Sequence, residues 1–392
     1  MASLATAIFK KVVLAKETTW GTKPATNTGK YGRRTGLEVN LTRAGVESQE
    51  INAHQQVNDF RLGLRTLSGT WNAELSCSTW ELFLAAALRA GWTAGVTSGP
   101  LTTVSFAAAT KKISRSSGSW ITDGFKLGDL INVAGAATAG NNGRAIVVGV
   151  TAADLTVDKV LVNESAGASV TVNVPGKKLS VPMSGHTDDS FTIEEFYSDI
   201  SVSERNVGVK VGGFELSLSP DSMATINFDL MGKNKETDTT AYFVSPAAAT
   251  TTASLSSAGG YAYTDNAPAT LLTGLSLTLT GNMEAAQVIG ADTAAAILPG
   301  RIQVSGELSA FFVDNSLADK FLNETEIGIG YRFDGGGESM VFKLPRVKLG
   351  GASKNDAPTG GIIITAPFTA LLYSGTGAAE NTTICIQDTT LA

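Results

Sequence analysis

Hydrophobic and polar residues alternate along most of the chain, and this period of two is typical of strands that bury one face. The clearest example spans 213–230, where the alternation stops for a Ser-Pro-Asp-Ser turn at 219–222 and then resumes. A second example spans 327–344 and has an Asp-Gly-Gly-Gly turn in its middle. Both segments predict β-hairpins. Pro345 follows the second hairpin and is predicted to end its last strand or to mark an exposed edge.

Helical periodicity is confined to two segments. The first is predicted to begin near Ser78 and Glu81, which have the spacing of a capping box, and to end at Gly91, a common C-terminal residue. An apolar stripe at every fourth position from Trp80 favours a helix of about three turns that lies on a sheet. The second segment, 316–322, is shorter. Strands are therefore expected to dominate, with one or two short helices beside them.

These two helices belong to a weak internal repeat. Residues 36–42 match residues 274–280, and the Ser-Gly pair at 68–69 matches the pair at 305–306. In both copies a helix that begins at a hydroxyl residue follows at the same distance. The order strand, connection, strand, helix thus occurs twice, roughly 238 positions apart, which favours an internal duplication.

The segment 98–178, between the two copies, has a different pattern. Short apolar stretches recur in it at spacings near 8 to 12 residues, with Gly and Asn turns between them, which is typical of a small barrel or sandwich. Pro100 and Pro175 bracket the segment, so we expect a small β domain inserted into a discontinuous main domain of residues 1–97 and 179–392. The apolar stretches are 125–127, 130–133, 146–150, 155–157, 161–162 and 170–174.

Composition agrees with this pattern. The 392 residues include 42 Gly, and small hydroxyl residues are abundant, which favours strands and turns over helices. The predicted fold class is all-β, with one or two short helices. The low-complexity stretches 246–260 and 350–361 are expected to be long exposed loops.

Charge and cysteine content disfavour several classes of protein. The net charge is −6 and no dense run of Lys or Arg occurs, so ordinary nucleic-acid binding is not expected. Cys77 and Cys385 lie far apart without metal-ligand spacing, so neither a disulfide framework nor a zinc site is suggested. Lys10, Lys11 and Lys16 interrupt the apolar N-terminal residues, unlike in a secretory signal, and no stretch approaches the roughly 20 apolar residues of a membrane helix. We expect a soluble protein made in a cytoplasm.

Candidate catalytic residues are scarce. His54 and His186 are the only histidines, so the chain has very few histidines from which to build a histidine triad or a multi-histidine metal site. The carboxylate pairs at 188–189 and 194–195 could imitate a glycosidase pair, but adjacent strand residues point to opposite faces, which favours solvated charges or interface contacts. The Gly-rich turns lack the Lys-Ser/Thr of a phosphate loop. We predict no enzyme, and no catalytic, cofactor-binding or metal-binding residue; the five Trp are expected mostly in cores.

Several segments, taken in order, carry a resemblance to a known family. Residues 16–22 read Lys-Glu-Thr-Thr-Trp-Gly-Thr, the polar segment 52–63 precedes the first Ser-Gly pair and the first helix, and strand-like segments follow at 190–200 and 208–218. This order resembles the tail tube proteins (major tail proteins) of long-tailed bacteriophages with non-contractile, siphovirus-type tails. The 98–178 segment looks like the small β-barrel or Ig-like domain often inserted in such tubes.

The resemblance implies a fold and an assembly. The fold would be two β-sheets packed as a sandwich or partial barrel with a flanking helix. Six subunits would close a ring, and rings would stack into a hollow tube in the virion tail, assembled in the host cytoplasm, for genome delivery. Implied partners are other copies, the tape measure protein, the tail terminator and distal tail or baseplate proteins. Double-stranded DNA would pass through without specific binding, which a neutral or acidic lumen favours.

Edge pairing between subunits gives this assembly a physical reason, because strand edges left open in one subunit can be paired by the next. The long polar segment 44–61 is expected to reach neighbouring subunits and to order on assembly. Alternatives are an outer-membrane barrel, disfavoured by the terminal Ala392 and the missing signal, and a secretion-system tube or capsid decoration subunit. A glycan-active enzyme ranks last, and would need two carboxylates about 5 to 10 Å apart in a groove.

Overall fold

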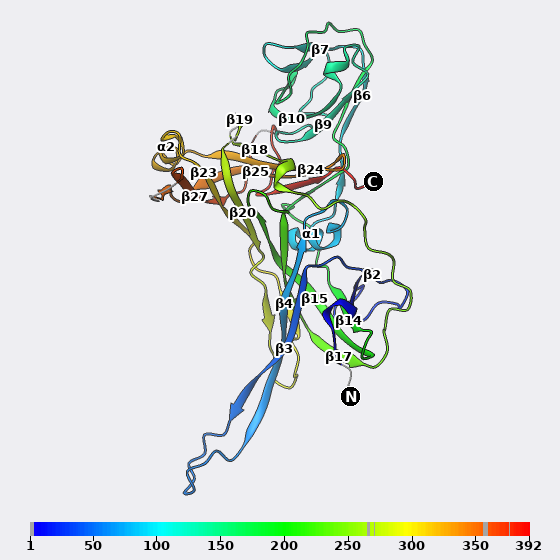
Figure 1. Ribbon diagram of the computed structural model, residues 1–392, viewed down its shortest axis with the longest axis vertical. Helices are drawn as coiled ribbons and strands as arrows, with labels where there is room; N and C mark the ends of the chain where they lie inside the picture. Colours follow the sequence, from blue (N-terminus) through cyan, green and yellow to red (C-terminus); the bar gives the residue numbers. More distant parts are fainter. Residues whose placement is uncertain (1–3, 265–266, 270, 356–359, 376) are drawn as a thin grey trace.

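Strands form almost all of the regular structure of this elongated molecule, as Figure 1 shows. The computed structural model describes residues 4–264, 267–269, 271–355, 360–375 and 377–392. In this part of the chain the helices are α1 (Glu81–Leu88) and α2 (Ser316–Leu322), with the 3₁₀ turns η1 (Ala7–Phe9), η2 (Ala139–Asn141) and η3 (Ser257–Gly259). The prediction of an all-β fold with one or two short helices is confirmed.

An antiparallel sheet, here called the central sheet, runs through the molecule. Its strands lie in the order β3 (Gly36–Glu47), β4 (Phe60–Glu74), β16 (Thr225–Gly232), β15 (Val202–Leu218), β20 (Leu272–Thr280), β23 (Gln303–Phe311), β27 (Ile363–Ala370), and finally β25 (Glu338–Leu349) with β26 (Ser353–Lys354). The predicted hairpin at 213–230 is confirmed, because β15 and β16 pair across the turn.

A second layer grows out of two strands of the central sheet. The first part of β15 pairs with β14 and β17, and the first part of β25 lies between β24 and β28. Apolar residues of both layers share one core, as in a sandwich. The strands of this layer are β1 (Lys10–Lys16), β2 (Lys30–Tyr31), β14 (Phe191–Tyr197), β17 (Asn234–Asp238), β18 (Gly260–Thr264), β19 (Ala267–Pro268), β24 (Ile327–Gly335), β28 (Cys385–Asp388), β13 (Lys177–Ser180) and β5 (Thr93–Ala94).

Pro345 does not end its strand, so the first of the two alternatives predicted for this proline was wrong. The hairpin of β24 and β25 forms as expected, but β25 continues through Pro345 to Leu349. The register against β24 shifts between Ile329 and Ile327, opposite the proline. A bulge at this point removes the need for the N–H that proline lacks.

Helix α1 packs on the central sheet, in the middle of an aromatic cluster. The Phe83 ring lies 5.2 to 5.3 Å from those of Trp71, Phe191 and Phe228, with edge-to-face geometry in each pair. The expected position on a sheet is confirmed, as is burial of Trp71, Trp80 and Trp120. Trp20 and Trp92 are half-buried.

The ends of α1 differ from the prediction. The helix spans only Glu81–Leu88, and its N-terminus has no side-chain cap, because Ser78 takes a left-handed conformation and donates its N–H to Asp388 Oδ2. At the other end Arg89, not Gly91, has φ of 55°. The Arg89 guanidinium holds this conformation by donating to the carbonyls of Gly281 and Gly300.

The two halves of the chain repeat the same strand order and register. The first half supplies β3, β4, α1, β14, β15 and β16, and the second supplies β20, β23, α2, β24, β25–β26 and β27 in the same order. Val39 pairs with Gly69 as Leu277 pairs with Gly306. A Cβ at either glycine would lie within 1.9 or 2.2 Å of a carbonyl oxygen on the neighbouring strand, so both copies require glycine there. That the repeat arose by duplication stays a prediction.

A separate sheet occupies the middle of the sequence and one end of the molecule (Figure 1). Its core contains only residues between Val96 and Val174. Among the described residues no pairing joins β6 to β7, so a closed barrel does not form. The stretches 125–127 and 161–162 form no strand, and the first three strands were missed. The sheet order is β6 (Thr97–Leu101), β12 (Val170–Asn173), β9 (Leu130–Ala134), β10 (Gly143–Val150), β11 (Asp154–Val157), β8 (Lys112–Arg115) and β7 (Val104–Ala107).

The low-complexity stretch 246–260 is only partly an exposed loop. Leu255 is fully buried, and Thr252 bonds through its carbonyl to Arg33 and through its hydroxyl to the Cys77 carbonyl. This stretch is therefore a strap across the core near α1. In the other stretch, 353–354 form β26, and 356–359 lie outside the described residues.

The domain boundaries at 98 and 178 stay a prediction, and a deletion tests them. Position 178 lies inside β13, whereas Gly95 N–H donates to the Gly176 carbonyl, so 96–175 is the better segment to remove. The main core contains no residue from 96–175, so the shortened chain with a Gly/Ser link is expected to unfold in one cooperative thermal transition and to keep its near-ultraviolet circular dichroism. A chain without such a transition would contradict the boundary.

Candidate assembly surfaces

The candidate catalytic residues are dispersed over the described part of the chain. His54 and His186 are exposed in separate loops, and within the described ranges no three His, Cys, Asp or Glu side chains gather as metal ligands. A groove of about 470 Å³ between β15, β18, β20 and β24 is lined by one described carboxylate, Asp221. A pair of carboxylates in a groove, the arrangement that a glycosidase needs, is not found among these residues.

The pair Glu194 and Glu195 is buried, which overturns the expectation of solvated charges or interface contacts. Glu194 accepts hydrogen bonds from the Ser203 hydroxyl and from two backbone N–H groups, those of Tyr242 and Phe243. Glu195, on the opposite face of β14, pairs with Lys10 and accepts from Asn206. Each carboxylate is satisfied inside the fold and joins β14 to other segments.

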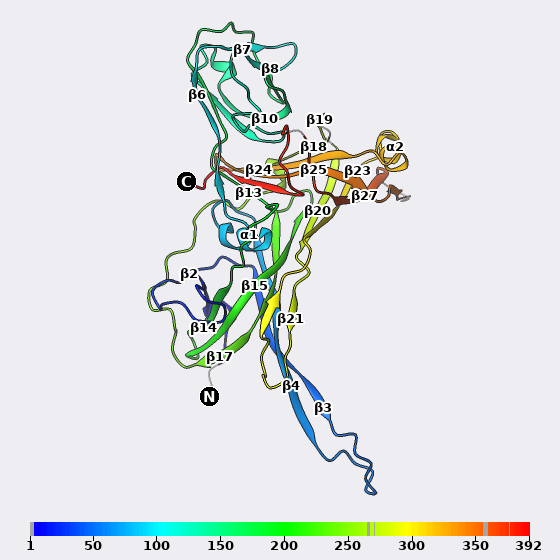
Figure 2. The ribbon, with the colours of Figure 1, turned by 180° about the vertical axis from the view of Figure 1, so that it is seen from behind.

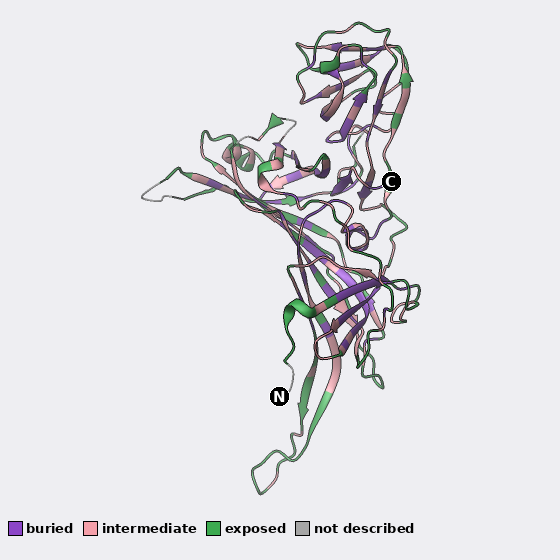
Figure 3. Ribbon diagram, turned by 45° about the vertical axis from the view of Figure 1, so that its right-hand side comes forward, coloured by how far each residue is buried: buried purple, intermediate pink, exposed green. Residues whose placement is uncertain are grey.

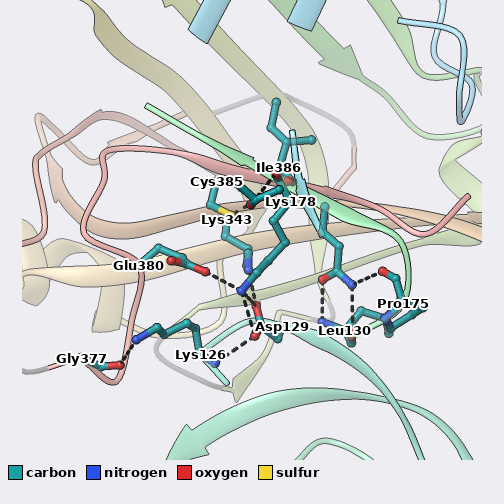
Figure 4. Close-up of polar contacts among 12 residues, drawn as sticks. Lys126, Asp129, Leu130, Pro175, Lys178, Lys343, Gly377, Glu380, Cys385 and Ile386 are labelled. Carbon is teal, nitrogen blue, oxygen red and sulfur yellow. Dashed lines mark hydrogen bonds and ion pairs between the residues drawn. The ribbon is translucent and has the colours of Figure 1, made fainter. Parts of the chain in front are cut away.

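One cluster of buried charges joins the inserted sheet to the main body (Figure 4). Asp129, just before β9, is fully buried and contacts the ammonium groups of Lys178 on β13 and Lys343 on β25, at 3.3 and 2.5 Å. Lys178 also pairs with Glu380 at 2.6 Å. Beside them Gln387 donates to the carbonyl of Leu130 and accepts from its N–H. The contacts of Asp129 and Leu130 cross from the inserted sheet to the main body, so the cluster holds the two sheets together.

The charges in this cluster stabilise one another. Burial alone would raise the pKa of Asp129, but Lys343 and Lys178 outweigh it, so the pKa is lowered. Burial would likewise lower the pKa of Lys343, but Asp129, with contributions from Cys385 and Glu380, raises it overall. All three groups therefore stay ionised near neutral pH. The Lys126 N–H also donates to Asp129, so this carboxylate is held from both its own loop and the main body.

The face of the central sheet that is turned away from the core is polar. Residues directly opposite in antiparallel strands share a face, so the pairs Glu38 with Thr70 and Glu215 with Thr278 lie on this side. Its carboxylates Glu38, Glu215, Asp229 and Glu307 are exposed. By the same pairing Lys210 and Lys348 also lie on this side, where they pair with Asp188 and Glu324. The polar face includes Glu38, Asn40, Thr70, Asn72, Asn227, Asp229, Glu215, Ser217, Ser276, Thr278, Ser305, Glu307 and Thr365.

Two hairpins project from the same end of the central sheet, as Figure 2 shows. The longer is formed by β3 and β4, and its tip at 48–59 is exposed (Figure 3). Ile51 and Val57, 102% and 63% exposed, lie at this tip. The shorter hairpin, β21 (Glu284–Ala286) and β22 (Ala296–Leu298), contacts the longer one through the Arg65–Asp292 ion pair. Apolar side chains at a projecting tip are typical of a contact surface.

The central sheet also ends in two edge strands without an outer neighbour in the described structure. At one edge β3 pairs only with β4, and at the other β26 pairs only with β27. Unpaired edges are available to strands of another chain. The described residues thus combine two open edges, one polar face rich in carboxylates and apolar tips, which are features of a self-assembling subunit.

Comparison with known families agrees with this arrangement. A family model described as phage tail tube protein matches residues 10–370. The chain belongs to the phage tail tube protein family. No curated protein matches it. The resemblance stated from the sequence is confirmed.

For a tail tube protein, the family gives the role at a coarse level. It is a structural subunit of the phage tail tube, its family is not one of enzymes, and its place is the virion tail. None of the described helices has the length and apolar character needed to cross a membrane.

Sequence reasoning found part of these surfaces. It singled out 44–61 as a reaching segment, and the structure places these residues at the projecting hairpin. It missed the second hairpin, β21–β22, because that stretch has weak alternation. It also missed a second signal of the repeat, in which Val-Lys-Val-Gly-Gly at 209–213 matches Val-Lys-Leu-Gly-Gly at 347–351.

The charge cluster gives a stability prediction. Replacing Asp129 by Asn leaves two buried ammonium groups without their carboxylate, and we expect the free energy of unfolding to fall by about 3–5 kcal/mol. Because the pKa of Asp129 is lowered on folding, the carboxylate contributes fully above its unfolded-state pKa of about 3.9. This contribution is lost as the pH falls further, through the folded-state pKa.

Denaturant unfolding of the wild type and the D129N variant, at pH 7 and at acid pH, measures both effects. The control is Asp154→Asn, which breaks the half-exposed pair with Lys112 and is expected to cost less than about 1 kcal/mol. Equal losses of unfolding free energy for the two variants at pH 7 would show that the buried cluster contributes no more to stability than the half-exposed ion pair.

Proposed function

We propose that copies of this chain close into rings that stack into a hollow tube, through which the phage genome passes into the host bacterium. The combination of two open sheet edges with one polar face supports this proposal most directly. Edge pairing around a ring would join the central sheets of successive copies, and the polar face would then line the inside. Assembly in the host cytoplasm and contacts with tape measure, terminator and distal tail proteins belong to the same proposal. The expected six subunits per ring stay a prediction.

Stacking of the rings is assigned to the two hairpins. Both point along the long axis from one end of the molecule, and an isolated hairpin tip gains little stability from its own chain (Figure 2). Contact with the next ring would bury Ile51 and Val57, which are exposed in the single chain. A head-to-tail contact of this kind repeats without closing, as a tube requires.

The polar face suits a channel for DNA. Hydroxyls, amides and carboxylates dominate this surface, and its lysines Lys210 and Lys348 are paired with carboxylates. It therefore offers little free positive charge to the phosphate backbone, so DNA would slide along it without being held. The resemblance implies a neutral or acidic lumen, and Glu38, Glu215, Asp229 and Glu307 are the carboxylates proposed to line it.

Electron microscopy with a mass measurement tests the assembly. Purified protein is expected to form rings and hollow polymers, and the I51D/V57D double variant is expected to form rings that no longer stack, because charges cannot be buried between rings. Val160→Asp is the control, since Val160 is 76% exposed on the inserted sheet. A chain that stays monomeric at high concentration would overturn the proposal.

Charge reversal tests the channel face. Glu307→Lys would repeat a cation along every ring, so tubes assembled with short duplex DNA are expected to retain it at low salt and to release it as salt rises. The matched control is Asp221→Lys, an exposed carboxylate in the turn after β15. Sedimentation of tubes with labelled DNA gives the readout. Equal retention by both variants would place Glu307 outside the lumen.

A further inference from the structure

The junction between the two halves shows how one copy can join the next. β15 first pairs on one side with β14, and beyond Gly212 the same side pairs with β20, from Gly213 opposite Thr280 to Leu218 opposite Leu275. In the second half, β25 first pairs on one side with β24, but beyond Leu349 no described strand follows on that side. The free edge of β26 thus corresponds to the edge of β15 that pairs with β20.

The counterparts agree residue by residue. Glu215 pairs with Asn227 on β16, and 138 positions later Ser353 pairs with Thr365 on β27. Both strands also shift register by one residue at the corresponding place, next to Gly212 and next to Gly350. On the other side of the junction, β3 has the register of β20, and its outer edge is free. The open edges of β26 and β3 therefore correspond to the edges of β15 and β20 that pair with each other inside the chain.

We propose that β3 of one copy pairs antiparallel with residues 351–355 of the neighbouring copy, in the register that joins β20 to β15. The inference rests on the proposed ring and names the strands that close it. The counterpart positions place Thr42 opposite Gly351, and Asn40 opposite Ser353. The same junction then occurs once within each chain and once between chains.

Gly351 supports the pairing independently. At its counterpart Gly213, a Cβ would lie 2.1 Å from the Leu279 carbonyl oxygen on β20, so only glycine fits. A Cβ on Gly351 would meet nothing closer than 3.6 Å in its own chain, and its φ is not in the left-handed region. The single chain does not require glycine at 351. The Leu41 carbonyl of a paired neighbour, in the place of Leu279, would require it.

Two lysines shield part of the β3 edge in the single chain. The Glu38 carbonyl points toward β4, so those of Leu37 and Val39 point to the free side, where Lys10 Nζ and Lys235 Nζ donate to them at 3.1 and 2.9 Å. Lysines at an edge hinder unspecific strand addition. Pairing with residues 351–355 of a neighbour covers Val39 and displaces the Lys235 ammonium group.

The repeat also changes the expected number of chains in a ring. Each chain supplies two equivalent units to the central sheet, joined by the junction that also joins chains. A ring with six such units contains three chains of 40.6 kDa rather than six.

Paired cysteines test the register in assembled protein. Asn40 and Ser353 would form a non-hydrogen-bonded pair with Cα atoms about 4.5 Å apart, within the range of a disulfide. The N40C/S353C variant is expected to give covalent dimers and trimers on a non-reducing gel, ending at three chains. The native Cys77 and Cys385 are buried. The control T42C/S353C, displaced by two residues, is expected to stay at the mass of one chain.

The outcomes separate this inference from the proposed function. Rings in the microscope without cross-links, or with equal cross-links in the control, overturn the pairing and leave the ring standing. Cross-links that continue to six chains overturn the count of three. The absence of any ring overturns the proposed function itself.

As a second test, Gly351→Ala is expected to abolish rings. Gly350→Ala, whose Cβ would meet nothing closer than 3.6 Å, should keep them. Equal behaviour of the two variants would contradict the inference.

Discussion

The exchange of neighbours along β15 is the constraint on which the rest of the structure depends. This strand of 17 residues begins between β14 and β17 and ends between β20 and β16. The extra residue at Gly212 bends β15. The edge of β15 that pairs with β14 before this residue is therefore available to β20 after it. Without that turn the second half of the chain would have no edge to join, and the central sheet would stop after the first half.

The fold class and several elements could be predicted from the sequence because they depend on local patterns. Alternation gave the hairpins at 213–230 and 327–344, and an apolar stripe gave α1. The helix ends could not be predicted, because distant partners decide them: Asp388 takes the Ser78 N–H, and two far carbonyls hold Arg89. The burial of Glu194 and Glu195 was missed for the same reason, since their partners lie on other strands.

The assembly surfaces show the same division. Residues 44–61 were recognisable because a long polar segment between strands stands out locally. The polar face was not, because it gathers single residues from every strand of the central sheet and exists only once the register is known. The repeat was half visible: the Ser-Gly pairs pointed to it, and the Val-Lys-Val-Gly-Gly match would have completed it. A feature that lies within one segment can be recognised in the sequence, whereas a feature formed by the pairing of several strands cannot.

The buried charges fix the orientation of the inserted sheet relative to the main body. A flexible linker would let the sheet turn freely, but Asp129, Lys178 and Lys343 contact one another across the boundary, and Gln387 adds two hydrogen bonds to Leu130. Ion pairs of this kind specify an orientation more than they add stability. In an assembly every inserted sheet would therefore stand at the same angle to its own ring.

The lysine contacts on β3 bear on when a tube begins. A free chain must give up the bond from the Lys235 ammonium group to the Val39 carbonyl before its edge can accept a neighbour, so the first encounter between two chains gains little. A chain that meets an existing ring gains edge, hairpin and stacking contacts together. Growth from a template would thus be favoured over spontaneous nucleation, and free subunits could accumulate without polymerising until an initiator presents the first ring.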